Sequence, residues 1–247
     1  MKKPFKIICL LLLMPAILLA ENPKMGKYNK QKNIRKAYIV NTDAGIDITN
    51  SYGSIYVTTW DEDKVELDIL IKVSGDNEEW ANTRLNDIDI DINALKNLVS
   101  ARTIIGNSKN KSGRNNSIEI NYTIKIPKKG SVKLSNKYGN IVTTDLWGNA
   151  NVNCKYGNVT LGKLNSITNS INVDYANNTD IEFVKTGTIN SKYSKVSIGS
   201  FERIDFNSSY TDWNAQKGEI LKYNCNYGKI KIGNIDQILQ TEIISAL

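Results

Sequence analysis

The sequence repeats itself at a short and nearly constant interval. From residue 132 onward a tyrosine recurs every seventeen to nineteen residues, at Tyr138, Tyr156, Tyr175, Tyr193, Tyr210 and Tyr227. Units this short cannot bury an apolar face alone, and they gain a core only by stacking on their neighbours. The repeat therefore predicts a solenoid.

Each repeat has the pattern of two strands that meet near the tyrosine. Apolar and mostly small side chains alternate up to the tyrosine, which is typical of a β-strand. The next inward positions are expected three and eight residues after the tyrosine. They are Ile141 and Leu146 in the first repeat, and Asn178 and Phe183 in the repeat of Tyr175. The inward face thus changes parity just past the tyrosine, so we expect a bend there. Glycine would supply a positive φ angle at this bend in three repeats, at Gly139, Gly157 and Gly228.

The corners favour stacked coils over hairpins. They are longer and less regular than the two-residue turns that join hairpin strands. Like residues align at an offset of one repeat, as in coils stacked in parallel about 4.8 Å apart. Because parallel crossovers are almost always right-handed, we predict an all-β fold, a right-handed parallel β-helix-like solenoid of roughly six coils over residues 128–247. Apolar residues continue to Leu247 without a polar cap, so we expect an incomplete stack that self-associates through its C-terminal edge.

The N-terminus has the features of a secretory signal peptide. Lys2, Lys3 and Lys6 precede an apolar run that ends near Ala20 and is too short for a comfortable membrane span. We predict a signal peptide over residues 1–20 and export to the periplasm, the outer surface or the medium, with no transmembrane span in the mature chain. Cleavage removes three lysines and no acidic residue, which lowers the formal charge from +7 to +4. The basic residues of 21–36 then indicate a flexible leader, and nothing favours nucleic-acid binding.

Residues 37–127 are expected to form an irregular β region that caps the solenoid. Strand-like alternation runs through most of it, a short helix is expected over 78–85 with Asp76 or Asn77 as its cap, and residues 106–116 have the composition of a loop. Tyr52 and Gly53 repeat the tyrosine-glycine bend found downstream. The region therefore shares the β-layers of the solenoid.

Several segments together resemble a known bacterial family. They are the stretch from Asn50 to Val57 with Trp60 and Asp61 after it, the stretch from Tyr122 to Pro127, and the Tyr-Gly-Asn repeats. This combination is similar to the exported β-strand-repeat proteins of unknown function called putative adhesins, over most of the mature chain. The resemblance implies an envelope or surface protein of all-β solenoid form, an adhesin-like scaffold or binding module without catalytic residues. A cell-surface glycan or an envelope protein would be its partner.

Little in the sequence indicates catalysis. The chain has no histidine, which excludes histidine-based acid–base catalysis and serine triads that use histidine. Asp87, Asp89 and Asp91 could hold Ca²⁺, but a solvated strand face explains them better, and we predict neither a metal site nor a cofactor. The alternative is a carbohydrate-active β-helix enzyme resembling polysaccharide lyases. It would need clustered acids beside a lysine or arginine base, and the repeats contain one arginine, Arg203.

The tyrosine column is the candidate binding surface. Stacked coils would place six rings, those of Tyr138, Tyr156, Tyr175, Tyr193, Tyr210 and Tyr227, in one row of about 24 Å, where they could contact sugars. Corner packing is the competing explanation. Trp147 and Trp213 lie near corners and could extend an aromatic patch, though burial would also explain them. Cys154 and Cys225 stand four repeats apart, too far for a disulfide, so we expect free buried thiols.

Overall fold

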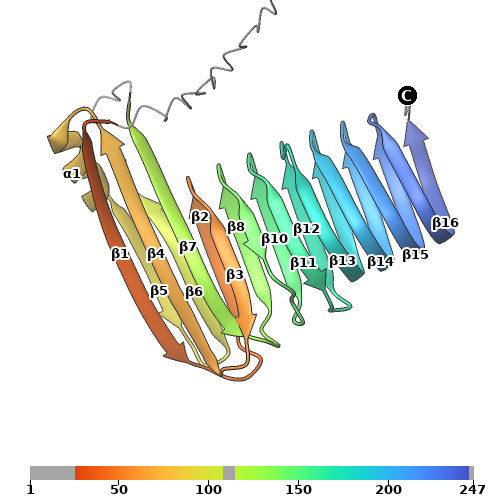
Figure 1. The fold of residues 1–247 in the computed structure, drawn as a ribbon, viewed down its shortest axis with the longest axis horizontal. Helices are drawn as coiled ribbons and strands as arrows, with labels where there is room; N and C mark the ends of the chain where they lie inside the picture. The colour runs from red at the N-terminus through yellow and green to blue at the C-terminus, as the bar shows by residue number, and fades with distance from the viewer. Residues whose placement is uncertain (1–25, 108–114, 245–247) are drawn as a thin grey trace, which may run out of the picture.

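The computed structural model describes residues 26–107 and 115–244 as an elongated stack of strands (Figure 1). Helix α1 (Glu78–Asn86) lies at one end of the stack and strand β16 at the other. The strands in these residues are β1 (Tyr28–Ile39), β2 (Gly45–Ser51), β3 (Ile55–Trp60), β4 (Lys64–Gly75), β5 (Ile88–Ala94), β6 (Leu98–Ile105), β7 (Ser117–Pro127), β8 (Val132–Lys137), β9 (Ile141–Thr143), β10 (Ala150–Lys155), β11 (Val159–Leu164), β12 (Asn169–Asp174), β13 (Thr179–Lys192), β14 (Lys195–Ser209), β15 (Asp212–Asn226) and β16 (Ile230–Ile244).

The repeats form a β-solenoid of about six turns, which confirms the predicted fold class. The strands that lead into the tyrosines pair in parallel as one face, here called the entry face, and those that leave the tyrosines form the exit face. On the entry face Val152 lies opposite both Leu134 and Ile171. These three side chains are fully buried. Like residues of successive coils thus stack in register and build a continuous apolar interior.

One repeat departs from the predicted alignment. Val159 of β11 lies opposite Thr179, and Leu164 lies opposite Val184. Thr179 and Val184 are therefore the inward residues of this coil, both fully buried, and the assignment of Asn178 and Phe183 to these positions is wrong. The corner after Tyr175 holds one residue more than its neighbours, which moves the following strand by one position.

The N-terminal region supplies a further coil and then closes the stack. β2 pairs in parallel with β8, and β3 pairs in parallel with β9, so Tyr52 occupies the same corner as the later tyrosines. Beyond this coil, β6 and β7 continue the two faces in parallel, and β5, β4 and β1 complete them as antiparallel strands. Helix α1 spans the expected residues, and its N-cap Asn77 accepts a hydrogen bond of 2.8 Å from the backbone N–H of Trp80.

The flexible leader expected over residues 21–36 is wrong from Tyr28 onward. Strand β1 starts there and pairs antiparallel with β4, with Lys36 opposite Leu67. Its basic residues lie on an edge strand, where charged side chains oppose pairing with other chains. The predicted signal peptide lies outside the described residues, and within them no helix has the length and apolarity needed to cross a membrane.

Three polar side chains inside the stack form a hydrogen-bond network at its N-terminal end. The side-chain amide of Asn50 donates to the carbonyl of Ile120 over 2.9 Å, and its oxygen accepts from the hydroxyl of Thr103 over 2.9 Å. The hydroxyl of buried Tyr122 lies 2.7 Å from that of Thr103. Burial raises the pKa of Tyr122 to about 12. The network ties the first coil to β6 and β7.

Both described cysteines are free and buried, as predicted. Cys154 lies opposite Asn136 and Val173, and Cys225 lies opposite Ser208, in coils far apart along the stack. Burial raises the pKa of the Cys154 thiol to about 12.

Candidate functional site

The tyrosine corners share an unusual backbone conformation. Every tyrosine of the series has a positive φ angle between 50° and 61°, namely Tyr52, Tyr138, Tyr156, Tyr175, Tyr193, Tyr210 and Tyr227. A residue other than glycine pays about 1–3 kcal/mol for such a conformation, which persists only where its surroundings fix it. The next coil holds these corners: the backbone N–H of Tyr138 donates to the carbonyl of Lys155 over 3.0 Å, and the equivalent bond is made by Tyr52, Tyr156, Tyr175, Tyr193 and Tyr210.

The glycines that follow the tyrosines allow the backbones of successive coils to come close together. A Cβ atom on Gly139 would lie 1.9 Å from the carbonyl oxygen of Gly53, and one on Gly157 would lie 1.9 Å from that of Gly139. Of the three glycines only Gly228 has a positive φ angle, 138°. The interpretation that glycine supplies the positive φ angle is therefore wrong for Gly139 and Gly157. In the other coils Ala176, Ser194 and Thr211 turn their side chains into the interior.

The seven tyrosine rings form one continuous stack along the solenoid, here called the tyrosine ladder. Successive ring centroids lie 4.8–5.2 Å apart with interplanar angles of 2–20°. The residues are between 41% and 52% exposed. Each inner ring is covered on both faces by its neighbours, so the ladder presents mainly ring edges and hydroxyl groups to solvent. The six predicted residues thus lie together, and Tyr52 extends the row.

Two lysines lie on the ladder. The amine of Lys137 is 4.8 Å from the ring centroid of Tyr138, and that of Lys155 is 5.4 Å and 5.8 Å from those of Tyr156 and Tyr175. These distances are within the range of cation–π interactions. The ladder therefore combines phenol hydroxyls with a local positive charge at its N-terminal half.

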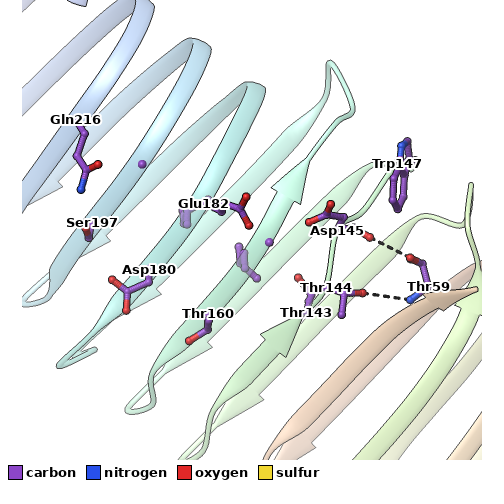
Figure 2. A pocket seen from close by; sticks show the side chains of 14 residues that line it. Thr59, Thr143, Thr144, Asp145, Trp147, Thr160, Asp180, Glu182, Ser197 and Gln216 are labelled. Carbon is purple, nitrogen blue, oxygen red and sulfur yellow. Dashed lines mark hydrogen bonds between the residues drawn. The ribbon is translucent and has the colours of Figure 1, made fainter. Parts of the chain in front are cut away.

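A groove that no sequence motif indicates crosses the exit face along the solenoid axis. It has a volume of about 750 Å³ and takes residues from β3, β9, β11, β13, β14 and β15 and the loop after β9. Figure 2 shows its labelled side chains, which come from successive coils: Thr59, Thr143, Thr144, Asp145, Trp147, Thr160, Asp180, Glu182, Ser197 and Gln216.

The floor of the groove follows a bend in each coil. At this bend Gly162 and Glu182 lie between paired positions of β11 and β13, and Gly199 and Gln216 do so in β14 and β15. Inward residues stand on both sides of the bend, so two consecutive residues face outward there. Gly199 has no room for a side chain, because its Cβ atom would lie 2.6 Å from the carbonyl oxygen of Glu182. Small and long side chains therefore alternate along the floor.

Hydrogen bonds fix the N-terminal end of the groove. The hydroxyl of Thr59 donates to the carbonyl of Asp145 over 3.1 Å, and the backbone N–H of Thr59 donates to the hydroxyl of Thr144 over 3.3 Å (Figure 2). The carboxylate of Asp145 accepts from the backbone N–H of Lys163 over 2.9 Å. Further along, the amine of Lys163 lies 3.4 Å from the carboxylate of Glu182. The groove is therefore a preformed surface of hydroxyls and carboxylates.

The two tryptophans considered from the sequence have different environments. Trp147 is 41% exposed at the edge of the groove, and the amine of Lys128 lies 4.7 Å from its ring centroid. Trp213 is buried, stacks on Phe206 at 4.3 Å and donates to the sulfur of Cys225 over 3.2 Å. Trp147 is thus available to a ligand, and Trp213 belongs to the core.

The candidate calcium ligands do not form a cluster. Asp87 is the C-cap of α1, while Asp89 and Asp91 are exposed on β5. In the part of the chain that the structure describes, no three His, Cys, Asp or Glu side chains come close enough together to hold a metal ion.

Comparisons with known proteins give likeness of fold only. No model of a known protein family matches the chain, and no curated protein matches it. Solved structures with similar folds include a putative adhesin from Bacteroides fragilis NCTC 9343, with 16% identity, a TM-score of 0.38 and coverage of 86% of this chain and 95% of that one. A putative adhesin from Parabacteroides merdae ATCC 43184 has 9% identity, a TM-score of 0.38 and coverage of 85% and 97%. A putative lipid binding protein from Parabacteroides distasonis ATCC 8503 has 12% identity, a TM-score of 0.34 and coverage of 89% and 97%.

Proposed function

We propose that this protein is an exported, non-catalytic binding module of the bacterial cell envelope, with a cell-surface glycan or an envelope protein as its partner. The observation that carries the proposal is the groove of the exit face, which crosses six neighbouring coils and exposes polar side chains on a rigid stack. Long surfaces of this kind are what repeat proteins use for extended partners. The predicted signal peptide supports export.

The tyrosine ladder is a second contact surface in this proposal. Its inner ring faces are covered, so the tyrosines Tyr138, Tyr156, Tyr175, Tyr193, Tyr210 and Tyr227 would contact a partner through ring edges and hydroxyl groups. Tyrosine suits this role because it offers a rigid apolar body with a polar tip.

Binding explains the groove better than catalysis. Its carboxylates are engaged with the protein itself, Asp145 with the backbone N–H of Lys163 and Glu182 with the amine of Lys163. A lyase-like site would need a basic side chain free to accept a proton, and Arg203 of β14 is not among the groove residues. The groove therefore resembles a recognition surface.

The proposal is tested with the mature protein, residues 21–247. It is labelled and applied to a glycan array and to intact bacterial cells, and bound protein is measured after washing. We expect saturable binding to cells or to a defined set of glycans. The same protein is incubated with polysaccharides, and unsaturated products are sought by ultraviolet absorbance. Absence of binding in both formats would contradict the binding role, and accumulation of unsaturated product would establish the enzymatic alternative.

A further inference from the structure

We infer that the groove of the exit face binds an uncharged or amino-substituted glycan chain, laid along the solenoid axis with one sugar ring against Trp147. The inference rests on the proposed function and names the ligand class and its site. Three properties of the groove carry it: its direction, its aromatic end and its charge.

The direction of the groove matches a chain ligand. Thr160, Asp180 and Ser197 line the groove, lie opposite one another in successive coils and face outward from the exit face. They form a row of polar groups with one coil, about 4.8 Å, between neighbours. A polymer with a hydroxyl-bearing repeat can place equivalent groups along this row. A small globular ligand would use only a part of it.

The backbone of the groove cannot pair with a peptide strand. The exit-face strands are already paired on both sides in the parallel stack, as β11 is with β9 and β13. β-Augmentation needs free backbone N–H and C=O groups at a sheet edge. Recognition in the groove therefore depends on side-chain hydroxyls, amides and carboxylates, which are suitable partners for sugar hydroxyls.

Trp147 supplies the apolar contact at one end. Among the exposed large hydrophobic side chains of residues 26–107 and 115–239 it is the one that lines the groove, and it is 41% exposed. Binding sites for small polar ligands combine such an aromatic surface with a few fixed polar groups. The hydrogen-bonded residues Thr59, Thr144 and Asp145 hold these polar groups beside it.

The negative charge of the groove determines which glycans it can bind. The described lining residues include the carboxylates of Asp145, Asp180 and Glu182 and no lysine or arginine. Two lysine amines lie next to the lining: that of Lys163 pairs with Glu182, and that of Lys128 lies 4.7 Å from the ring centroid of Trp147. Repulsion between like charges excludes partners efficiently, so a uronate or phosphate polymer is disfavoured. Neutral chains and chains that carry amino groups are compatible with the groove.

The test uses three probes of equal length: a chito-oligosaccharide, its de-N-acetylated form and an oligogalacturonate. Binding to the mature protein is measured by titration calorimetry. We expect binding of the first two probes and little of the third. Trp147→Ala should weaken binding of the chito-oligosaccharide about tenfold, the upper range for one aromatic contact, and Trp147→Phe should recover part of the loss. The matched control is Ile167→Ala, another exposed apolar residue, which should leave binding unchanged.

A charge reversal tests the selectivity. Asp180→Lys should weaken binding of the de-N-acetylated probe and improve that of the oligogalacturonate, whereas Asp205→Lys on the entry face should do neither. Melting curves establish that each variant is folded. Preference of the unaltered protein for the oligogalacturonate, absence of binding to all three probes, or equal binding by Trp147→Ala and Ile167→Ala would overturn the inference. The proposed function would survive these results if the same protein still bound cells or other glycans, and it would fail only if that binding were absent too.

Discussion

The tyrosine ladder is predicted to stabilise the solenoid through ring stacking in addition to the burial of apolar surface. Tyr175 has neighbours on both sides, with ring centroids at 5.0 Å in each direction. Each stacked pair contributes about 0.5–1.5 kcal/mol beyond area burial, so two pairs contribute about 1–3 kcal/mol. About half of the residue is buried, roughly 100 Å², which adds about 2.5 kcal/mol at 25 cal/mol per Å². Tyr175→Ala should therefore lower the free energy of unfolding by about 3.5–5.5 kcal/mol.

Two other tyrosines separate stacking from burial. Tyr56 of β3 is 41% exposed like the ladder residues but lies outside the ladder, so Tyr56→Ala should cost only the area term. Tyr52 has one ladder neighbour at 5.2 Å, so Tyr52→Ala should give an intermediate loss. Urea unfolding followed by far-ultraviolet circular dichroism measures the three changes, provided that the m-value stays constant. Equal losses for Tyr175→Ala and Tyr56→Ala would refute a contribution from stacking.

The backbone adds a second, independent test at the same position. Tyr175 has a φ angle of 55°, which alanine adopts at a cost of about 1–2 kcal/mol and glycine adopts freely. Tyr175→Gly should therefore be more stable than Tyr175→Ala by about 1 kcal/mol, the reverse of their usual order within strands. The usual order would mean that the corner relaxes out of the positive-φ conformation once the ring is removed.

Three further predictions concern the corners, the interior and the end of the stack. Gly157→Ala should destabilise by about 1–3 kcal/mol because its Cβ atom would meet the backbone of the preceding coil, whereas Ala176→Gly should cost less, and thermal unfolding compares them. Burial raises the pKa of Cys154 to about 12 against 9.0 for the free thiol, so between these values the thiol is neutral in the folded protein and ionised in the unfolded one. The free energy of unfolding should therefore be unaffected by this group below pH 9 and should fall as the pH rises toward 12. Cys154→Val, which introduces the residue found at Val173 in the next coil, should reduce this fall in urea titrations at several pH values. β16 pairs only with β15 among the described residues and exposes Ile238, so we expect concentration-dependent self-association in sedimentation velocity, weakened by Ile238→Lys; a monomer at all concentrations would count against it.

The sequence predicts the stack but not the place where its register shifts. Periodicity and parity identify the inward residues of the regular coils, because each one must match its neighbours in the apolar interior. A constant offset after Tyr175 predicts that the polar Asn178 lies at an inward position. The structure instead buries Thr179 and accommodates the extra residue in the corner. Two polar residues side by side gave no apolar signal to choose between them.

Strand β1 was missed for a related reason. Its lysines and arginine are typical of a solvated segment, and most of its side chains are indeed exposed. The strand is nevertheless attached to the fold, because Ile34 and Tyr38 pack against the core. A charged edge strand has the composition of a linker. Its pairing partner β4 follows two intervening strands, so the sequence does not indicate that the two strands pair. The glycine positions were recognised, but the approach of one coil to the next, which excludes a side chain at Gly157, depends on the stacked structure.

The groove could not be found from the repeat because it consists of the positions at which the repeat varies. Inward and corner positions are restricted by neighbouring coils, which explains why their residues recur. The outward row of Thr160, Asp180 and Ser197 is free of this restriction and differs from coil to coil. Substitutions in this row should therefore change binding with little effect on folding, while substitutions in the ladder should change folding first. A solenoid of this kind separates the residues that build the stack from those available to recognise a ligand, and the two classes can be assigned by measuring stability and binding on the same set of variants.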